Sequence, residues 1–161
     1  MTVSNRPKQN PAHPNVKIQP PRLVLIHVAL VFLLTWLLPL PLVVPPVLQV
    51  VGFLLDLLGF LLGVGAQIAF RRARATRNSN GSTSQLVTVG IYRFTRNPVY
   101  LGFLLILVGI SLNSGSYWGM LLAPILVILF NQLVIWPEEE YLAYKFGEQY
   151  RRYRAKVRRW I

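Results

Sequence analysis

The amino-acid sequence predicts an all-α membrane protein, and three observations carry this prediction. The chain of 161 residues is 53% hydrophobic and only 14% charged, whereas a soluble domain has about 25% charged residues. Its apolar residues fall in four long blocks, and a helix of about 20 apolar residues has the length that crosses a bilayer. Nearly all charged residues lie outside these blocks. The sequence therefore predicts about four transmembrane helices and a C-terminal amphipathic cytoplasmic helix.

The N-terminal part of the chain combines a polar tail with two predicted spans. Residues 1–21 hold five prolines and few apolar residues, a composition typical of disordered segments. We expect residues 22–161 to form the membrane domain, with its first span at about 23–43 and its second at about 47–70. Four prolines break the chain between these spans, as a turn requires; they are Pro39, Pro41, Pro45 and Pro46.

The C-terminal half begins with two further spans, predicted at about 98–112 and 117–136. The first of them is short, so we expect it either to form a tight hairpin with the next span through the intervening "NSGS" or to start below the headgroups. Pro137 is suited to the first turn of a helix, and it opens a predicted cytoplasmic helix over about 137–157. The apolar positions of this helix recur every three or four residues, which indicates one buried face; they are Leu142, Phe146, Tyr150, Tyr153 and Val157.

The basic residues predict the orientation of these spans. All 17 lysines and arginines lie before the first span, between the second and third, or after the fourth. Cytoplasmic loops are enriched in such residues, so both termini and the long middle loop are predicted to be cytoplasmic. The net charge of +12 is then explained by topology and by attraction to anionic lipid, and we expect no nucleic-acid partner. The length and the absence of cysteine suit a prokaryotic cell membrane.

Cysteine and histidine usage excludes several kinds of site. The chain has no Cys, so it forms no disulfide, thiolate metal site or cysteine nucleophile. Its two histidines, His13 and His27, are too few and too poorly placed for a metal site built on imidazoles. We therefore expect no bound metal.

Two features inside the second span allow alternative interpretations. Gly59 and Gly63 are spaced so that another helix can approach closely; the partner helix belongs either to the same chain or to a second copy in an oligomer. Asp56 is the only acidic residue inside a predicted span, and an intramembrane carboxylate is a functional candidate by default. The alternative is a structural Asp that is hydrogen-bonded to a neighbouring helix or reaches water at the outer face.

Polar residues that could form a site concentrate in two predicted cytoplasmic segments. In the first, Asn97 is a good N-cap for a helix that starts at Pro98, and Tyr92 and Tyr100 flank this junction. In the second, Glu138 lies four residues before Leu142, so its carboxylate falls on the apolar face and requires a partner. Capping of the helix N-terminus would explain the neighbouring Glu140 but not Glu138. A cationic ligand would supply the missing partner.

Two stretches resemble motifs of one enzyme family. They are "LVTVGIYRFTRNPVYLG", residues 86–102, and "EEEYLAYKFGEQYRRY", residues 138–153. In order and spacing they resemble the isoprenylcysteine carboxyl methyltransferase family and its phospholipid-methyltransferase relatives. The resemblance implies an integral membrane methyltransferase that uses S-adenosyl-L-methionine at the cytoplasmic face and methylates a carboxylate, thiol or amine of a membrane lipid or another small hydrophobic molecule.

The resemblance also implies which residues contact the cofactor. The implied contacts are Gln85, Leu86, Val87, Tyr92, Asn97, Pro98, Tyr100 and Glu138, with Glu139 close by. Glu138 and Tyr100 are the catalytic candidates. Asn97 replaces a histidine of the family, and Val134 replaces an arginine that the eukaryotic enzymes carry, so these positions decide whether the family chemistry is altered. Two alternatives stay open: an NADPH-dependent reductase of the sterol-reductase type, and a non-catalytic membrane protein that retains the fold.

Overall fold

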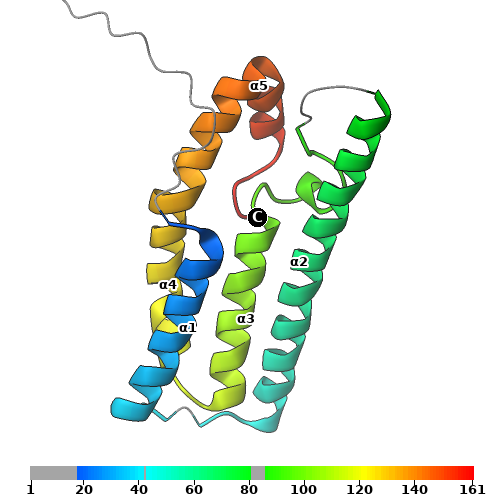
Figure 1. The fold of residues 1–161 in the computed structure, drawn as a ribbon. Coiled ribbons are helices and arrows are strands. Elements are labelled where there is room, and N and C mark those ends of the chain that lie inside the picture. Colours follow the sequence, from blue (N-terminus) through cyan, green and yellow to red (C-terminus); the bar gives the residue numbers. More distant parts are fainter. Residues whose placement is uncertain (1–17, 42, 81–85) are drawn as a thin grey trace, which may run out of the picture.

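The computed structural model describes residues 18–41, 43–80 and 86–161, and within this part every regular element is a helix (Figure 1). The predicted all-α class is therefore confirmed. The tail over residues 1–17 lies outside the described residues. The elements are α1 (Pro20–Leu37), α2 (Pro46–Asn80), the 3₁₀ turn η1 (Gly90–Arg93), α3 (Pro98–Ser114), α4 (Trp118–Phe130), the π-helix η2 (Asn131–Ile135) and α5 (Trp136–Lys156).

The outer surface of the bundle is apolar, as expected of a protein surrounded by lipid. Large side chains such as Phe32, Phe53 and Phe60 are about 60% exposed, and contiguous exposed apolar surface of this kind marks contact with a membrane. Three helical stretches are long and apolar enough to cross a bilayer: Pro20–Leu37, Pro46–Ala73 and Trp118–Lys156. The helix α3 is also apolar, but its 17 residues are fewer. The chain is therefore an integral membrane protein.

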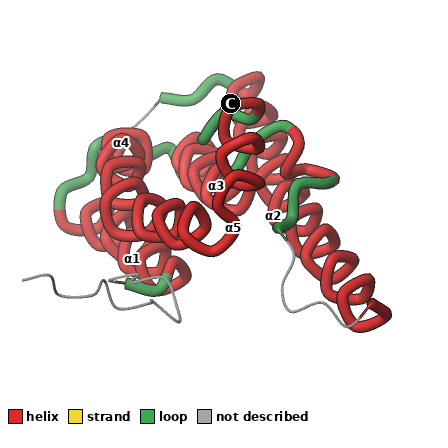
Figure 2. Tube along the Cα trace, turned by 90° about the horizontal axis from the view of Figure 1, so that it is seen from above, coloured by secondary structure: helices red, strands yellow, loops and turns green. Residues whose placement is uncertain are grey.

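The helices pack side by side in the order α2, α3, α4, α1 (Figure 2). Short connections join α1 to α2 and α3 to α4 at one end of the bundle, and the segment 86–97 lies with α5 at the other end (Figure 1). At the short-loop end, Thr35 Oγ1 and Ser116 Oγ lie 2.8 Å apart, and the indole of Trp118 donates to the Leu38 carbonyl at 2.7 Å. Uncharged groups thus connect the two short loops.

Prolines fix where the helices begin. Pro occupies the first turn of α1, α3 and α5, where its missing N–H has no intrahelical partner to lose. The helix α1 begins at Pro20 rather than at the predicted residue 23, and it ends at Leu37, short of the predicted residue 43. The prolines that follow account for this early end, because a residue before proline disfavours helical dihedral angles.

No break in helical structure separates the predicted fourth span from the predicted cytoplasmic helix. Helical structure continues without a break through α4, η2 and α5, and the π-helix lies directly before Pro137. The wider π turn occurs at the point where the ladder of hydrogen bonds loses the N–H of this proline. The second helical half of α5 then changes direction at Gly147, whose φ of 50° is a conformation that glycine adopts without strain. The helix predicted over about 137–157 therefore has two parts, which meet at this glycine.

The closest helix packing occurs between α2 and α3. A Cβ atom added at Gly59 would lie 2.5 Å from the carbonyl oxygen of Gly102, whereas one added at Gly63 would meet no atom within 4 Å. Gly59 thus serves contact within the chain, which is the first of the two interpretations given above, and Gly63 takes no part in it. This packing holds α3 between α2 and α4, and Tyr100 lies in the first turn of α3.

Candidate functional site

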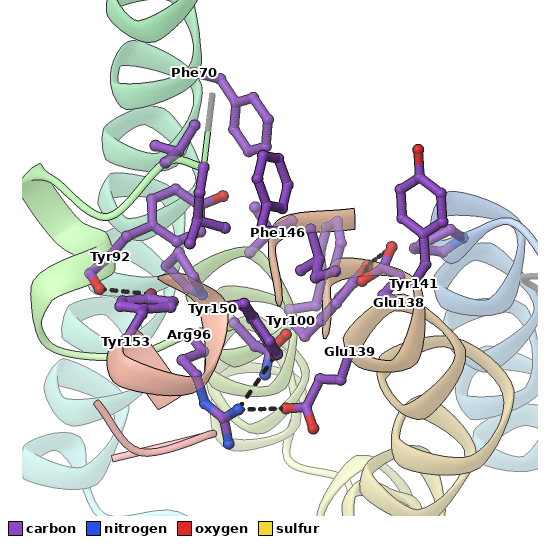
Figure 3. A pocket seen from close by; sticks show the side chains of 18 of the residues that line it. Phe70, Tyr92, Arg96, Tyr100, Glu138, Glu139, Tyr141, Phe146, Tyr150 and Tyr153 are labelled. Atoms are coloured by element: carbon purple, nitrogen blue, oxygen red, sulfur yellow. Dashed lines mark hydrogen bonds and ion pairs between the residues drawn. The ribbon is translucent and has the colours of Figure 1, made fainter. Parts of the chain in front are cut away.

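A pocket opens at the end of the bundle that carries α5 and the segment 86–97. There α1, α2, α3 and α5 meet this segment (Figure 3). It encloses about 830 Å³, within the range of sites that hold small molecules. Aromatic and carboxylate side chains dominate its wall, together with one arginine. Figure 3 labels Phe70, Tyr92, Arg96, Tyr100, Glu138, Glu139, Tyr141, Phe146, Tyr150 and Tyr153. The two predicted cytoplasmic segments therefore do meet around one cavity.

Glu138 and Tyr100 form a hydrogen-bonded pair on this wall. The Tyr100 hydroxyl donates to both carboxylate oxygens of Glu138, at 3.0 Å each. Tyr100 is buried, and its ring packs against Phe130 with 4.9 Å between ring centroids, so the position of its hydroxyl is well defined. Among the described residues no Lys, Arg or His pairs with Glu138. The pocket thus contains a fixed carboxylate with no cationic partner from the described part of the chain.

Glu139 is paired, in contrast to its neighbour. Its Oε1 lies 3.0 Å from Arg96 Nη1, and its Oε2 lies 2.7 Å from Arg159 Nη2. The Nε of Arg159 also donates to Oε1 at 3.1 Å, which completes a bidentate contact. Glu139 is buried, and two guanidinium groups neutralise it. Its role in the structure is therefore to join α5, segment 86–97 and the C-terminal segment.

The C-terminal segment, residues 157–161, turns back towards the top of α3 (Figure 1). The Arg159 carbonyl accepts hydrogen bonds from Thr95 Oγ1 at 3.1 Å and from Asn97 Nδ2 at 3.0 Å, and the Arg158 carbonyl accepts one from the Arg96 N–H at 3.1 Å. The sequence did not predict this contact, because nothing in a run of basic residues indicates that their backbone returns to the start of α3.

The prediction that Asn97 caps a helix beginning at Pro98 is confirmed for its position but not for its side chain. Asn97 occupies the N-cap position, but its side chain makes no capping hydrogen bond. Its amide instead donates to the Arg159 carbonyl, and its own N–H donates to Thr95 Oγ1 at 3.1 Å. The competing partner is the C-terminal segment, which the sequence did not place beside Asn97.

Two tyrosines from distant parts of the chain close the pocket on the side of η1. The Tyr153 hydroxyl donates to the Tyr92 carbonyl at 2.7 Å (Figure 3), and the Tyr92 ring meets Phe70 of α2 edge-on at 5.7 Å. Burial raises the pKa of Tyr153 to about 12. Burial, and to a lesser degree the nearby Tyr153 and Glu138, also raises the pKa of Tyr92 above its ordinary value. Both phenols therefore stay protonated near neutral pH.

All but one of the residues that the resemblance implies as cofactor contacts line this pocket. Gln85 lies outside the described residues. The other implied residues line the pocket: Leu86, Val87, Tyr92, Asn97, Pro98, Tyr100, Glu138 and Glu139. The wall also includes residues that the resemblance did not supply, among them Phe70, Arg96 and the prolines Pro20 and Pro21 at the start of α1. Leu142 and Phe146 also line the pocket, and both belong to the face of this helix that the sequence predicts to be buried.

Asp56 lies away from the pocket, between α2 and α3. Its Oδ2 accepts a hydrogen bond from Asn113 Nδ2 at 2.8 Å. A Cβ atom added at Gly109 would collide with the carboxylate, so the glycine makes room for this contact. The carboxylate is thus hydrogen-bonded to a neighbouring helix, which is the structural alternative given for it above.

Comparison with known proteins points to one family. Residues 47–149, more than half of the chain, match the family described as phospholipid methyltransferase. An uncharacterized protein of Haemophilus influenzae is 46% identical over 63 residues, which cover 39% of this chain and 100% of that protein. The protein-S-isoprenylcysteine O-methyltransferase of Schizosaccharomyces pombe is 39% identical over 72 residues, which cover 45% of this chain and 30% of that enzyme. No solved structure matches the chain significantly.

Proposed function

The chain belongs to the phospholipid methyltransferase family, and from this premise we propose that it transfers a methyl group from S-adenosyl-L-methionine to a small or lipid-like acceptor at the cytoplasmic face of the membrane. The observation that carries the proposal is the pairing of Glu138 with Tyr100 in the wall of an 830 Å³ pocket. This carboxylate is held in place and has no cationic partner among the described residues.

The residues of the pocket suit this methyl donor. S-adenosyl-L-methionine carries a sulfonium and an ammonium group, and when bound it supplies an already activated methyl group. Glu138 would face these cationic groups. The rings of Tyr92 and Tyr100 also line the cavity, and aromatic faces attract cations. The large apolar part of the wall excludes water, which strengthens such attraction.

The work of the protein in this reaction is to hold two reactants in line. The acceptor atom forms a bond to the methyl carbon as the carbon–sulfur bond breaks, and the bonding electrons stay on sulfur. Positioning of this kind can supply much of the rate enhancement. Tyr92 and Tyr153 are protonated near neutral pH, as ordinary phenols are, and burial raises the pKa of each further. A carboxylate or thiolate acceptor arrives deprotonated and needs no base, whereas an amine would have to pass its proton to a group such as Glu138.

The apolar side of the pocket suits a hydrophobic acceptor. Pro20 and Pro21 from α1 line the cavity together with Leu142 and Phe146 from α5. The cavity thus extends to the first turn of an apolar helix, from which a molecule dissolved in the bilayer could enter sideways. Val134 is fully buried in the core and offers no positive charge to an acceptor carboxylate, so a prenylcysteine is not assigned as the substrate.

The arrangement gives less support to the reductase alternative. A dinucleotide needs cationic groups for its phosphates, and among the described residues that line the pocket Arg96 is the only Arg or Lys. Its guanidinium already pairs with Glu139 and donates to the Tyr150 hydroxyl at 3.3 Å. Asn97 is likewise occupied by the Arg159 carbonyl, so the absence of the family histidine affects an anchoring contact and does not by itself indicate a non-catalytic protein.

A binding comparison tests the proposal. The detergent-purified protein is titrated with S-adenosyl-L-methionine and, separately, with NADPH. We expect saturable binding of the methyl donor and none of NADPH. The reverse result would favour the reductase, and binding of neither ligand would favour a non-catalytic protein.

A further inference from the structure

A second hollow shares Tyr153 with the pocket but has otherwise different walls. It measures about 420 Å³ and lies between the second half of α5 and η1 with the residues just before η1. Its polar lining consists of Thr88, Arg93, Gln149, Arg152 and Lys156. We call it the basic hollow. The reaction proposed above does not use it.

The charges around the basic hollow are not balanced by its own walls. Three cationic side chains line it, all of them exposed, and none of its lining residues is acidic. Within the described part of the chain, Arg93 and Lys156 form no ion pair or hydrogen bond, and Arg152 pairs only with the exposed Glu148, at 3.5 Å. Like charges that line one hollow repel one another, although solvent weakens the repulsion. An anion in the hollow would relieve this repulsion.

The types of side chain favour a phosphate group over other anions. Arginine presents a planar set of N–H donors that matches phosphate oxygens, and lysine adds a compact charge. The Thr88 hydroxyl and the Gln149 amide are further hydrogen-bond donors at the same hollow. A phosphate can accept hydrogen bonds from several donors at once, whereas a chloride ion or a single carboxylate uses fewer of them.

The depth of the hollow matches the lipid headgroups. The turn η1 lies against the last apolar part of α2, where the Tyr92 ring meets Phe70 at 5.7 Å. The next residues of α2 are Arg71 and Arg72, so the apolar stretch ends at this level. Arginines directly after an apolar stretch mark the level of the phosphate groups of the membrane.

We propose that the basic hollow is a binding site for a phosphate group, presented by an anionic lipid headgroup. A soluble phosphate would offer the same chemistry, and the test separates the two sources. A ligand held between Arg93 and Lys156 connects η1 to the second half of α5, the same two segments that the hydrogen bond from Tyr153 to the Tyr92 carbonyl joins. The site is thus distinct from the methyl-donor pocket and shares a wall with it.

Charge elsewhere on α5 provides a matched control. Arg151 and Arg154 lie on the same half of α5 as Lys156, are exposed, and do not line the hollow. The double variants R93Q/K156Q and R151Q/R154Q remove the same amount of charge. If the positive charge only orients the chain in the membrane, the two variants should have the same affinity for a phosphate-bearing ligand. A specific site makes their affinities differ.

The experiment measures binding of two probes to the detergent-purified full chain, short-chain phosphatidic acid and inorganic pyrophosphate, by native mass spectrometry and by the shift of thermal unfolding. Each basic residue near a bound anion contributes roughly a factor of five in affinity. We therefore expect R93Q/K156Q to bind phosphatidic acid about 25-fold more weakly than the wild type, with less than about a threefold loss in R151Q/R154Q.

The outcomes separate cleanly. Selective loss with phosphatidic acid supports a lipid site, and the same selective loss with pyrophosphate alone supports a phosphate site for a soluble ligand. Equal loss in both variants, or loss in neither, overturns the proposal. Phosphate-free dioctanoylglycerol tests the wild type without any mutation; if it binds as tightly as phosphatidic acid, the phosphate is not recognised and the proposal fails even where the R93Q/K156Q variant cannot be purified folded.

Discussion

Asp56 and Glu138 are both carboxylates in an apolar helical bundle, yet their surroundings differ. Asp56 is held between α2 and α3 by the amide of Asn113 at 2.8 Å, and it does not line the pocket. Glu138 is held by the Tyr100 hydroxyl at 3.0 Å and lines a cavity of about 830 Å³. Each carboxylate has a hydrogen-bond partner from the chain, but only Glu138 lines the pocket. A half-buried acid therefore indicates a binding site when a cavity accompanies it, and a structural contact when it lies between packed helices.

The strongest way to break this comparison is to neutralise each carboxylate in turn. We expect Glu138→Gln to lower methyl transfer about 100-fold, because an interaction with a charged group contributes about 2–3 kcal/mol. Asp56→Asn keeps an oxygen that can accept from Asn113, so we expect its activity within about twofold of the wild type. The measurement is the radiolabelled methyl group transferred from S-adenosyl-L-methionine into the lipid extract of membranes that contain each variant. Equal losses in the two variants would contradict the comparison.

Glu139 sharpens the contrast, because it is buried beside Glu138 but is paired with two arginines. Removing one partner of a fully buried ion pair costs about 3–5 kcal/mol. Arg159 is partly exposed, so we expect Glu139→Gln to lower the free energy of unfolding by about 2 kcal/mol. Denaturant or thermal unfolding of the detergent-purified protein measures this effect. The exposed Glu140 is the control, and Glu140→Gln should leave the stability unchanged.

The contact between α2 and α3, where Asp56 lies, can be tested through Gly59 and Gly63 of α2. A methyl group at Gly59 would lie 2.5 Å from the Gly102 carbonyl oxygen, while one at Gly63 would meet nothing. We expect Gly59→Ala to destabilise the protein by about 1–2 kcal/mol through overpacking, and Gly63→Ala to leave it unchanged or slightly more stable through helix propensity. Thermal unfolding of both variants measures the difference. If Gly63→Ala were the damaging change, the assignment of the α2–α3 contact would be wrong.

The smallest expected effect concerns the tyrosine contact that closes the pocket. Tyr153→Phe removes the hydrogen bond to the Tyr92 carbonyl, and we expect a loss of about 1 kcal/mol in the free energy of unfolding. The pKa of Tyr153 is raised to about 12 from an ordinary value of 10.0. The contribution of its protonated hydroxyl to the free energy of unfolding is therefore complete below pH 10 and is lost as the pH rises towards 12. The stability difference between wild type and variant should therefore shrink over this range. A difference that stays constant with pH would contradict the burial of this phenol.

Much of this arrangement follows from local patterns in the sequence. The spacing of Glu138 and Leu142 on one helix face placed the carboxylate inward, and the apolar blocks predicted the helices. The prolines at residues 98 and 137 predicted helix starts because proline lacks an N–H, whereas the start of α1 at Pro20 was not predicted. These features depend on interactions within one or two helical turns, so they can be read without knowledge of the fold.

The contacts that the sequence did not reveal join segments far apart in the chain. The bidentate pair between Arg159 and Glu139 requires α5 to bend at Gly147, and a single glycine inside a helical pattern does not specify the new direction. Phe70 reaches the pocket because η1 folds against the end of the apolar part of α2, a contact between distant segments that the sequence does not specify. The side chain of Asn97 favoured the Arg159 carbonyl over the cap, because tertiary contacts override local preferences at this junction.

The most direct test of the central claim is a calorimetric titration of the wild type and of Glu138→Gln with S-adenosyl-L-methionine. If Glu138 faces the cationic groups of the donor, the variant should bind it at least about tenfold more weakly, because loss of a charge-assisted contact costs at least about 1.5 kcal/mol. Equal affinity in the two proteins would contradict the claim and would leave the Tyr100–Glu138 pair as a structural contact like that of Asp56.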